Sequence, residues 1–283
     1  VDTTSEVLVR AQPSIKMEPD YDLAALAIPA SLKTVEGFHL AKPDNENLIG
    51  ILAVGFCQYA TGFIEDEFEQ AGVAGDLDGQ AYQAKRATKS YFRCLNYALK
   101  MVPKSWAKNI EGTPEAFIAK VNSTGWKYRD GMQWAGIGLA GAINYNKDDI
   151  AMVALHLDKA LAILERVVAL DDKKDLDDPA RRVLPHLALG MAHTSRGKAV
   201  GGDPARGERH FKRAIEITGG RFLLAKVLYA RGYARITGKR ELFRKLLIEV
   251  LKTDPAIWPE QRLANEIAHR RARRYLKLEK EWF

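Results

Sequence analysis

Val250-Leu-Lys-Thr-Asp-Pro255 closes an apolar, helix-forming stretch, and the same arrangement of a helix followed by a stop recurs along the chain. In each copy, a residue expected to face inward lies five positions before a Pro, Asp or Gly that ends the helix. The other four copies are Phe38-His-Leu-Ala-Lys-Pro43, Ala98-Leu-Lys-Met-Val-Pro103, Val167-Val-Ala-Leu-Asp-Asp172 and Ala214-Ile-Glu-Ile-Thr-Gly219. Recurrence of one supersecondary unit is typical of stacked helical repeats, in which each repeat packs only on its neighbours.

The residues between these stops also follow a helical period. From Asn47 to Gln70 the apolar positions are Ile49, Leu52, Ala53, Phe56, Ala60 and Phe63, spaced as on one face of an α-helix. Because we find no segment that alternates with a period of two, we predict an all-α fold, a degenerate tetratricopeptide-like helical-hairpin solenoid. The repeats are degenerate because the stops lie 60, 69, 47 and 36 residues apart, whereas a regular tetratricopeptide repeat has about 34 residues.

The domain organisation follows from the same pattern. We expect an extended N-terminal arm over residues 1–24, which contains Pro13 and Pro19, and a single helical repeat domain of about four to five helix pairs over residues 25–283. A long insertion near 104–130, which we expect to be irregular, holds Trp106, Trp126 and Tyr128. Long connections without regular structure are usually functional or disordered.

The charge is distributed unevenly. Residues 1–180 carry 19 Lys/Arg and 26 Asp/Glu, net −7, whereas residues 181–283 carry 24 and 10, net +14. A basic region suits nucleic acid, an acidic protein or the acidic half of another copy. Apart from Arg270-Arg-Ala-Arg-Arg274, the basic residues are spread through ordinary helices, so we expect no nucleic-acid partner.

The cysteines and the lengths of the apolar runs in the sequence further limit the classes of protein to which the chain can belong. Cys57 and Cys94 lie on apolar helical stretches, and we expect two small buried hydrophobic side chains, with a disulfide in an oxidising compartment as the alternative. We find no run of about 18 apolar residues of the kind that spans a membrane. Residues 1–12 lack the basic start and apolar core of a secretory signal.

Catalytic and metal-binding motifs are missing from the sequence. Gly202-Asp-Pro-Ala-Arg-Gly207 faintly resembles a phosphate-binding loop but lacks the Lys-Ser/Thr pair that reaches phosphate and magnesium. His186 and His193 lie two turns apart on one helix, too far apart to share a metal. We therefore predict no enzyme, no cofactor and no metal site.

A helix rich in small residues is the most unusual element. Trp134-Ala-Gly-Ile-Gly-Leu-Ala-Gly-Ala-Ile143 contains three glycines, and each costs a helix about 1 kcal/mol relative to alanine. Close approach of another helix would compensate for this cost, and so would a ligand against the backbone. We favour helix packing and keep the ligand as the alternative.

Several strings resemble the TatT family. They are Gly55-Phe-Cys-Gln-Tyr-Ala-Thr-Gly-Phe-Ile-Glu-Asp-Glu67, Tyr91-Phe-Arg-Cys-Leu-Asn-Tyr-Ala98, Gly219-Gly-Arg-Phe-Leu-Leu-Ala-Lys-Val-Leu-Tyr-Ala-Arg231 and Arg262-Leu-Ala-Asn-Glu-Ile-Ala-His-Arg-Arg-Ala-Arg273. The resemblance runs from about residue 25 to the end. It implies an accessory periplasmic lipoprotein of a tripartite ATP-independent periplasmic (TRAP) transporter. Such a protein is built on cryptic tetratricopeptide repeats, forms homotrimers, associates with the substrate-binding protein and has a hydrophobic cavity. The family's lipid-bearing N-terminal cysteine is absent from this sequence, so either the anchor was removed or this member is soluble.

The resemblance also suggests site residues. Trp134, Gly138, Gly141 and Tyr145 are expected to line an apolar cavity, with Trp126 and Tyr128 at its mouth, although ordinary core aromatics would give the same pattern. A partner or oligomer face is expected to pair the acidic residues Glu65 and Glu67 of one copy with Arg270, Arg271 and Arg274 of another. The alternative function is a general tetratricopeptide scaffold that binds a peptide or helix of a protein partner.

Overall fold

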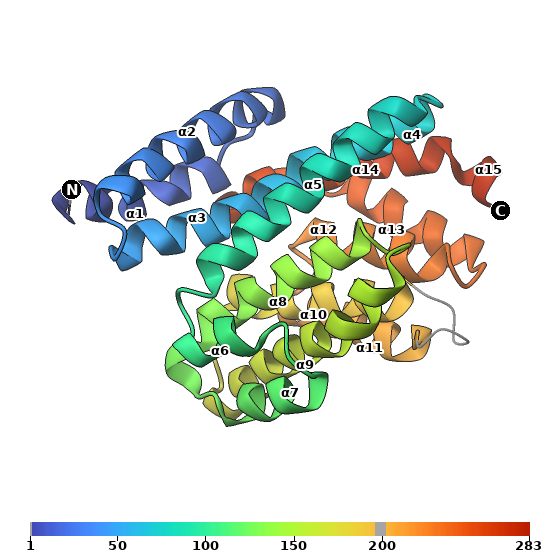
Figure 1. Ribbon diagram of the computed structural model, residues 1–283. Helices are drawn as coiled ribbons and strands as arrows, with labels where there is room; N and C mark the ends of the chain where they lie inside the picture. The colour runs from blue at the N-terminus through green and yellow to red at the C-terminus, as the bar shows by residue number, and fades with distance from the viewer. Residues whose placement is uncertain (1, 196–201) are drawn as a thin grey trace. The chain divides into compact units, whose positions relative to one another are not determined.

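A computed structural model describes residues 2–195 and 202–283, and all the regular structure in these ranges is helical (Figure 1). The all-α prediction is confirmed, while the solenoid arrangement stays a prediction. The expected loop at 198–207 falls partly outside the described residues. The chain divides into two compact units, unit 1 (Val1–Gln12 and Ala25–Lys174) and unit 2 (Pro13–Ala24 and Asp175–Phe283). This division differs from the single domain that the repeat pattern suggested.

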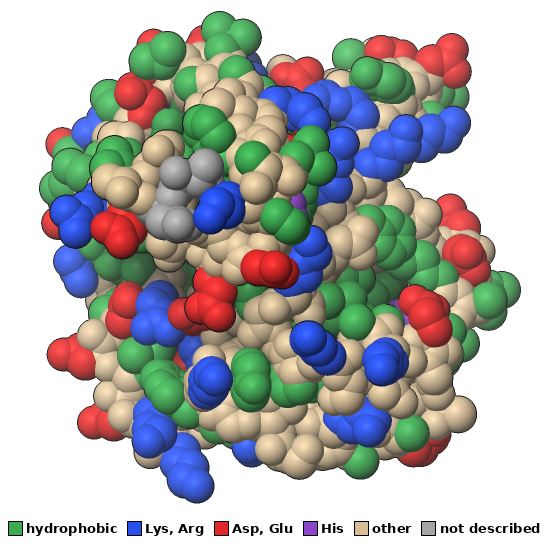
Figure 2. Space-filling model, turned by 60° about the vertical axis from the view of Figure 1, so that its left-hand side comes forward, with side chains coloured by type: hydrophobic (Ala, Val, Ile, Leu, Met, Phe, Trp, Pro, Cys, Tyr) green, Lys and Arg blue, Asp and Glu red, His purple; other side chains and the backbone are tan. Residues whose placement is uncertain are grey.

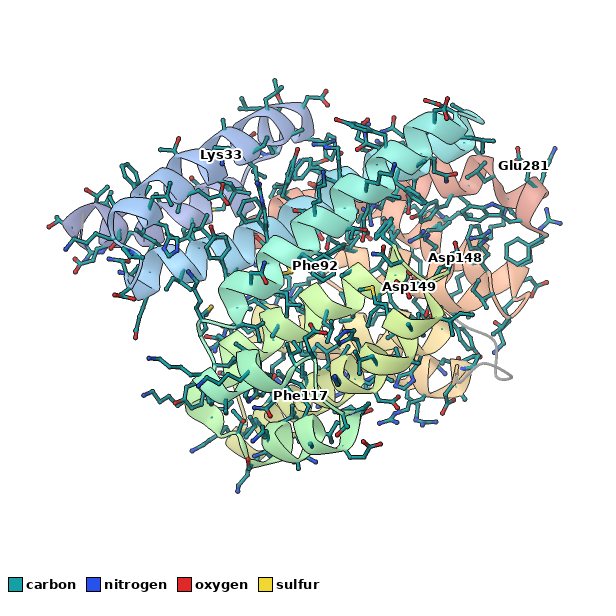
Figure 3. All side chains as sticks on the ribbon, viewed as in Figure 1. Lys33, Phe92, Phe117, Asp148, Asp149 and Glu281 are labelled. Carbon is teal, nitrogen blue, oxygen red and sulfur yellow. A yellow bond between two sulfur atoms is a disulfide. The ribbon has the colours of Figure 1, made fainter. Side chains whose placement is uncertain are left out.

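Unit 1 is built around a helical hairpin and the glycine-rich helix. α3 (Glu46–Tyr59), a π-helical turn (Ala60–Ile64) and α4 (Glu65–Val73) form one continuous helix, which a turn at 74–76 connects to α5 (Leu77–Ala98). α5 packs on α3, α4 and α8 (Arg129–Asn144), and α8 packs on α9 (Ile150–Lys174). Asp149 caps α9 by accepting the Met152 N–H at 3.0 Å (Figure 3). The core therefore lies on both sides of α8.

Glu46–Val73 is the one helix in the described ranges that is long and apolar enough to cross a membrane, by length and composition alone. The expectation of no such run was therefore wrong. However, 61% of its most apolar window is buried inside the protein. A helix in a packed core passes the same test, because its partner helices create the same demand for apolar residues as lipid does.

The expected N-terminal arm is helical rather than extended. α1 spans Asp2–Lys16 and α2 spans Tyr21–Ala41, with Pro13 and Pro29 inside these helices. Ser5 is buried, and its hydroxyl accepts hydrogen bonds from the Asn45 and Asn47 side-chain amides at 3.1 and 3.3 Å. The prolines misled the prediction because a proline inside a helix removes one backbone hydrogen bond and its ring crowds the preceding turn. The contacts that stabilise α1 despite this cost come from Asn45 and Asn47, which are distant in sequence.

The insertion near 104–130 is also mostly helical. α6 (Lys104–Asn109), α7 (Pro114–Ser123) and a 3₁₀ turn (Trp126–Tyr128) fill it. Trp106 is fully buried and donates to the Thr124 hydroxyl at 3.1 Å. Its ring meets the ring of Phe117 edge-on, and Phe117 is labelled in Figure 3. Lys159 of α9 is fully buried as well, and its ammonium donates to the carbonyls of Ile110 and Gly112. These long-range contacts order a segment whose own sequence carries only a weak helical signal.

Unit 2 consists of helical hairpins. α10 (Pro179–Thr194) packs on α11 (Pro204–Ile217). α12 (Leu223–Tyr229) continues into a second π-helical turn (Ala230–Ala234) and contacts α11, α13 (Arg240–Lys252) and α14 (Arg262–Lys277). α15 (Glu279–Trp282) ends the chain. The expected stops at Pro43, Pro103, Gly219 and Pro255 follow helix ends, whereas Asp172 lies inside α9, which continues to Lys174.

Candidate functional site

The glycines of α8 allow neighbouring helices to approach its backbone. A Cβ on Gly141 would stand 2.4 Å from the Tyr91 ring, and one on Gly138 would stand 3.0 Å from the Leu95 backbone nitrogen. Gly136 faces Leu164 of α9 in the same way, at 2.8 Å. Contacts with α5 and α9 therefore compensate for the glycines, as the helix-packing interpretation expected.

A disulfide joins the hairpin beside α8. Cys57 of α3 and Cys94 of α5 are buried and bonded to each other. The expectation of two separate buried thiols was therefore wrong, and the alternative of a bridge holds. The Trp134 carbonyl of α8 lies 3.4 Å from the Cys94 sulfur. Sequence could not decide between thiols and a bridge, because the pairing depends on how the two helices are placed against each other.

A carboxylate and a tyrosine meet where the first π-helical turn ends. The Tyr91 hydroxyl of α5 donates to Glu65 at 2.5 Å and lies 3.0 Å from the Thr61 hydroxyl. Burial, followed by the nearby charge of Glu65, raises the pKa of Tyr91 well above its usual value. The phenol therefore stays a neutral donor that holds the carboxylate.

Aromatic rings extend this cluster to the end of α8. Tyr145 stacks on Tyr91 with ring centroids 6.2 Å apart, and Phe68 of α4 meets Tyr145 edge-on at 5.1 Å. Five residues singled out from the sequence, Glu65, Trp134, Gly138, Gly141 and Tyr145, thus belong to one assembly of α3, α4, α5 and α8. Sequence reasoning missed Tyr91, its central side chain, although Tyr91 stood in a quoted motif.

Trp126 and Tyr128 do not join this cluster. Both are half-buried and precede the first residue of α8, whereas Tyr145 follows its last. At 1.5 Å per residue, the 16-residue helix separates the two ends by about 24 Å. The six expected cavity residues therefore do not converge on a single point.

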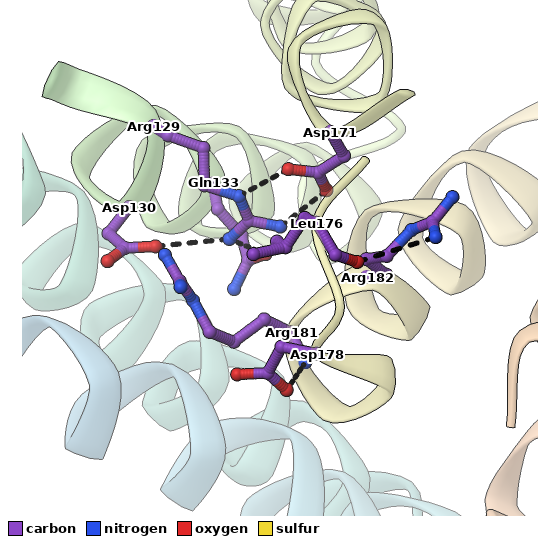
Figure 4. Close-up of polar contacts among 8 residues, drawn as sticks. All are labelled: Arg129, Asp130, Gln133, Asp171, Leu176, Asp178, Arg181 and Arg182. Carbon is purple, nitrogen blue, oxygen red and sulfur yellow. Dashed lines mark hydrogen bonds and ion pairs between the residues drawn. The ribbon is translucent and has the colours of Figure 1, made fainter. Parts of the chain in front are cut away.

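A buried ion pair fixes the first turn of α8 (Figure 4). The Arg129 guanidinium donates to both carboxylate oxygens of Asp171, at 2.7 and 2.6 Å, and to Gln133 at 2.7 Å. Burial disfavours the charged guanidinium, but the hydrogen bonds and charge of Asp171 outweigh burial and raise the pKa of Arg129. Such a bidentate pair sets the position of α8 against α9.

Unit 2 contains a related contact at its own π-helical turn. The Tyr229 hydroxyl donates to Glu208 of α11 at 2.8 Å, and the Lys212 ammonium lies 3.0 Å from the same carboxylate. Burial would raise the pKa of Glu208, but the hydrogen bonds from Lys212 and the tyrosines outweigh it and lower the pKa to about 2. The repeated string Tyr-Ala-x-Gly-aromatic, at 59–63 and 229–233, is the signal that could have found the two π-helical turns beside which these contacts lie. In the described ranges, no group of three or more His, Cys, Asp or Glu is arranged to hold a metal ion.

The comparison with protein families decides what this helical assembly belongs to. The model of the TRAP transporter T-component family matches residues 17–283. The chain belongs to this family. As a T-component it is an accessory component of a TRAP transporter and acts on the periplasmic side of the transport system.

This T-component also has a curated relative. A protein of Treponema pallidum (strain Nichols), described only as uncharacterized, is 25% identical over 270 residues, which are 90% of this chain and 78% of the relative. The relative's description adds no function, so the family match carries the assignment.

The expected partner face of the T-component is partly buried. Glu67 is exposed, Glu65 is half-buried against Tyr91, and Asp66 between them is fully buried. On α14, the Arg270 guanidinium lies over the Tyr21 ring at 4.4 Å, Arg274 is half-buried and Arg271 is fully buried. The burial of Arg271 does not fit its expected place on an exposed face.

Proposed function

We propose that this T-component is a non-enzymatic accessory protein that associates with the periplasmic substrate-binding protein of its TRAP transporter and passes an apolar or organic-acid ligand through a cavity. The observation that carries the proposal is the family match over residues 17–283. The Cys57–Cys94 disulfide supports a periplasmic address, because disulfides persist in oxidising compartments such as the periplasm.

The proposed cavity divides the residues expected from the sequence into two groups. Trp126 and Tyr128 before α8 and Tyr145 after it are half-buried and would contact the ligand at two separate points of its passage. Trp134, Gly138 and Gly141 lie within the packing of α8 against α5 and would hold the wall. Replacing Trp126 and Tyr128 with alanine is expected to weaken ligand transfer while leaving the helical circular-dichroism signal unchanged.

The proposed assembly is a homotrimer, lipid-anchored in its native form, with Glu67 and Arg270 on the contact face. Opposite charges on the two halves of the chain support contacts between copies. Sedimentation of Glu67→Lys and Arg270→Glu variants tests this face. Single reversals should dissociate the assembly and the double reversal should restore it, whereas unchanged sedimentation of both single variants would exclude the face.

The association itself is tested by purifying the tagged T-component from native periplasm and identifying the co-purifying proteins by mass spectrometry. Recovery of a TRAP substrate-binding protein is expected, with an unrelated tagged periplasmic protein as the control. Repeated absence of any such binding protein, at expression levels where the bait is recovered intact, would overturn the proposal.

A second candidate function is a tetratricopeptide-type scaffold that binds a peptide or helix of a protein partner. One observation favours it, a surface groove of about 430 Å³ between α11, α12 and α13 in unit 2.

A further inference from the structure

The groove of unit 2 is lined by apolar side chains and by the glycine turn that follows α11. Ile215, Leu242 and Leu246 are its apolar lining residues, which we call the floor. Gly219 and Gly220, which follow α11, have φ values of 56° and 73°, in the left-handed region that favours glycine. Within the described residues, nothing but its chain neighbours lies within 4 Å of the place where a Cβ on Gly219 would stand. The groove is therefore open to solvent beside Gly219.

Some charged side chains on the rim of the groove form ion pairs within the described residues, and one lysine does not. Lys226 pairs with Glu249 at 3.2 Å, and Glu216 is engaged by Arg213 at 2.8 Å. Lys245 lines the groove, is exposed, and has no ion-pair partner within residues 2–195 and 202–283. Both acidic groups of the rim are thus neutralised by basic side chains, while one ammonium remains available.

The groove also lies in the basic part of the chain. Residues 181–283, which include the whole groove, carry a net charge of +14. Electrostatic complementarity selects partners of opposite charge and raises the rate at which they associate. A partner segment that suits this groove therefore carries carboxylates for the rim and a bulky apolar side chain for the floor.

We infer that the α11–α12–α13 groove docks an acidic peptide segment of another protein, with an apolar side chain of the segment on Ile215, Leu242 and Leu246 and a carboxylate beside Lys245. The inference rests on the proposed function, since it specifies the kind of protein segment through which a partner is held. It adds a site in unit 2 that is separate from the α8 cluster of unit 1.

The test uses the full chain and a fluorescent synthetic peptide in which Leu-Phe is flanked by glutamates. Fluorescence anisotropy should show binding that weakens with added salt. A peptide with lysines in place of the glutamates, and one with serines in place of Leu-Phe, should not bind. If either replaced peptide binds as tightly as the original peptide, the inference is overturned.

Variants on α13 locate the peptide on the protein. Lys245→Glu should raise the dissociation constant about tenfold or more, because it replaces the attraction between the ammonium and the peptide carboxylates with a repulsion. The matched control is Lys252→Glu, an exposed lysine two turns further along the same helix that does not line the groove. Equal weakening by both variants would mean that the peptide responds only to overall charge, and would exclude the groove. Leu242→Gln, on the floor, should also weaken binding, and circular dichroism verifies that it folds.

The same variants separate this inference from the proposed function. If Lys245→Glu recovers a TRAP substrate-binding protein from periplasm as well as the wild type does, and the peptide result is also negative, the groove is wrong but the accessory role stands. If the wild type recovers no such protein while the peptide still binds in the groove, the accessory role fails and the docking site stands.

Discussion

The two π-helical turns share a sequence but are supported by different interactions. Ala60–Ile64 and Ala230–Ala234 each follow a tyrosine and share the pattern Tyr-Ala-x-Gly-aromatic. In both turns an N–H bonds to the carbonyl five residues earlier, from Glu65 to Ala60 and from Arg235 to Ala230. The same short string therefore produces the same unusual backbone in each unit.

The surroundings of the two turns differ. In unit 1, the carboxylate of Glu65 follows the turn and the tyrosine comes from the neighbouring helix, whereas in unit 2 Tyr229 precedes the turn and Glu208 comes from the neighbouring helix. Unit 1 also has the disulfide at Cys57, where unit 2 has Val227 at the matching position. The turn of unit 1 thus has a disulfide nearby, whereas that of unit 2 has the Lys212–Glu208 ion pair. Local sequence therefore sets the turn, and tertiary packing sets which interactions stabilise it.

Removing the covalent bond should have the largest effect. The two cysteines are 37 residues apart, and closing a loop of this length stabilises a fold by about 3 to 4 kcal/mol. Replacing both cysteines with alanine should lower the free energy of unfolding by about this amount in urea titrations. Reductant should lower the stability of the wild type and leave that of the variant unchanged. Two free thiols in the unfolded, unreduced wild type would contradict the bridge.

The next largest effect is expected from removing the two tyrosine hydroxyls, one in each unit, because the loss of stability should differ between them. Tyr91→Phe removes a hydroxyl that bonds both Glu65 and Thr61, and we expect a loss of about 1.5–3 kcal/mol, the range for hydrogen bonds to charged groups. Tyr229→Phe should cost less, because it removes the bond to Glu208 while Lys212 still contacts that carboxylate at 3.0 Å. Urea unfolding of both variants measures the difference, and a larger loss for Tyr229→Phe would reverse the comparison.

An added methyl group against the Tyr91 ring tests how tightly the ring is packed in unit 1. Gly141→Ala would place a Cβ 2.4 Å from a ring that Thr61 and Glu65 hold in place, and overpacking costs about 1–3 kcal/mol. Gly37→Ala is the matched control, since within the described residues nothing beyond its own helix backbone lies within 4 Å of its Cβ position, and should stabilise α2 by up to about 1 kcal/mol. Thermal unfolding of both variants shows whether each substitution raises or lowers the stability. Stabilisation by Gly141→Ala would show that the Tyr91 ring moves freely.

The smallest expected effect is a loss of stability when the pH is lowered. In unit 2, burial and the neighbouring His186 lower the pKa of His210 to about 3. Its contribution to stability is therefore complete above the unfolded pKa of about 6.5 and is lost as the pH falls toward 3. Between pH 7 and pH 6 the loss should be below about 1 kcal/mol. Thermal unfolding of the wild type and of His210→Gln across this range measures it, and parallel pH profiles of the two proteins would contradict this role.

Several features could be read from local sequence because their causes are local. Asp178 and Asp203 each precede a proline and cap a helix, accepting the N–H groups of Arg181 and Arg206 at 3.1 and 2.9 Å. Such caps need only neighbouring residues. The apolar period and the recurring stops likewise predicted the all-α class, and the strings at both ends of the chain predicted the family.

Only the tertiary structure decided which side chains meet. Whether Cys57 bonds Cys94, whether Arg271 faces solvent and which group holds Glu65 all depend on residues tens of positions away. The same holds for α1 and for the helices near 104–130, which long-range partners such as Asn45 and Lys159 hold in place. Sequence alone thus determined the all-α class, most of the helix ends and the family of this chain. The packing of those helices determined the buried contacts, because burial and pairing depend on distances that no local pattern encodes.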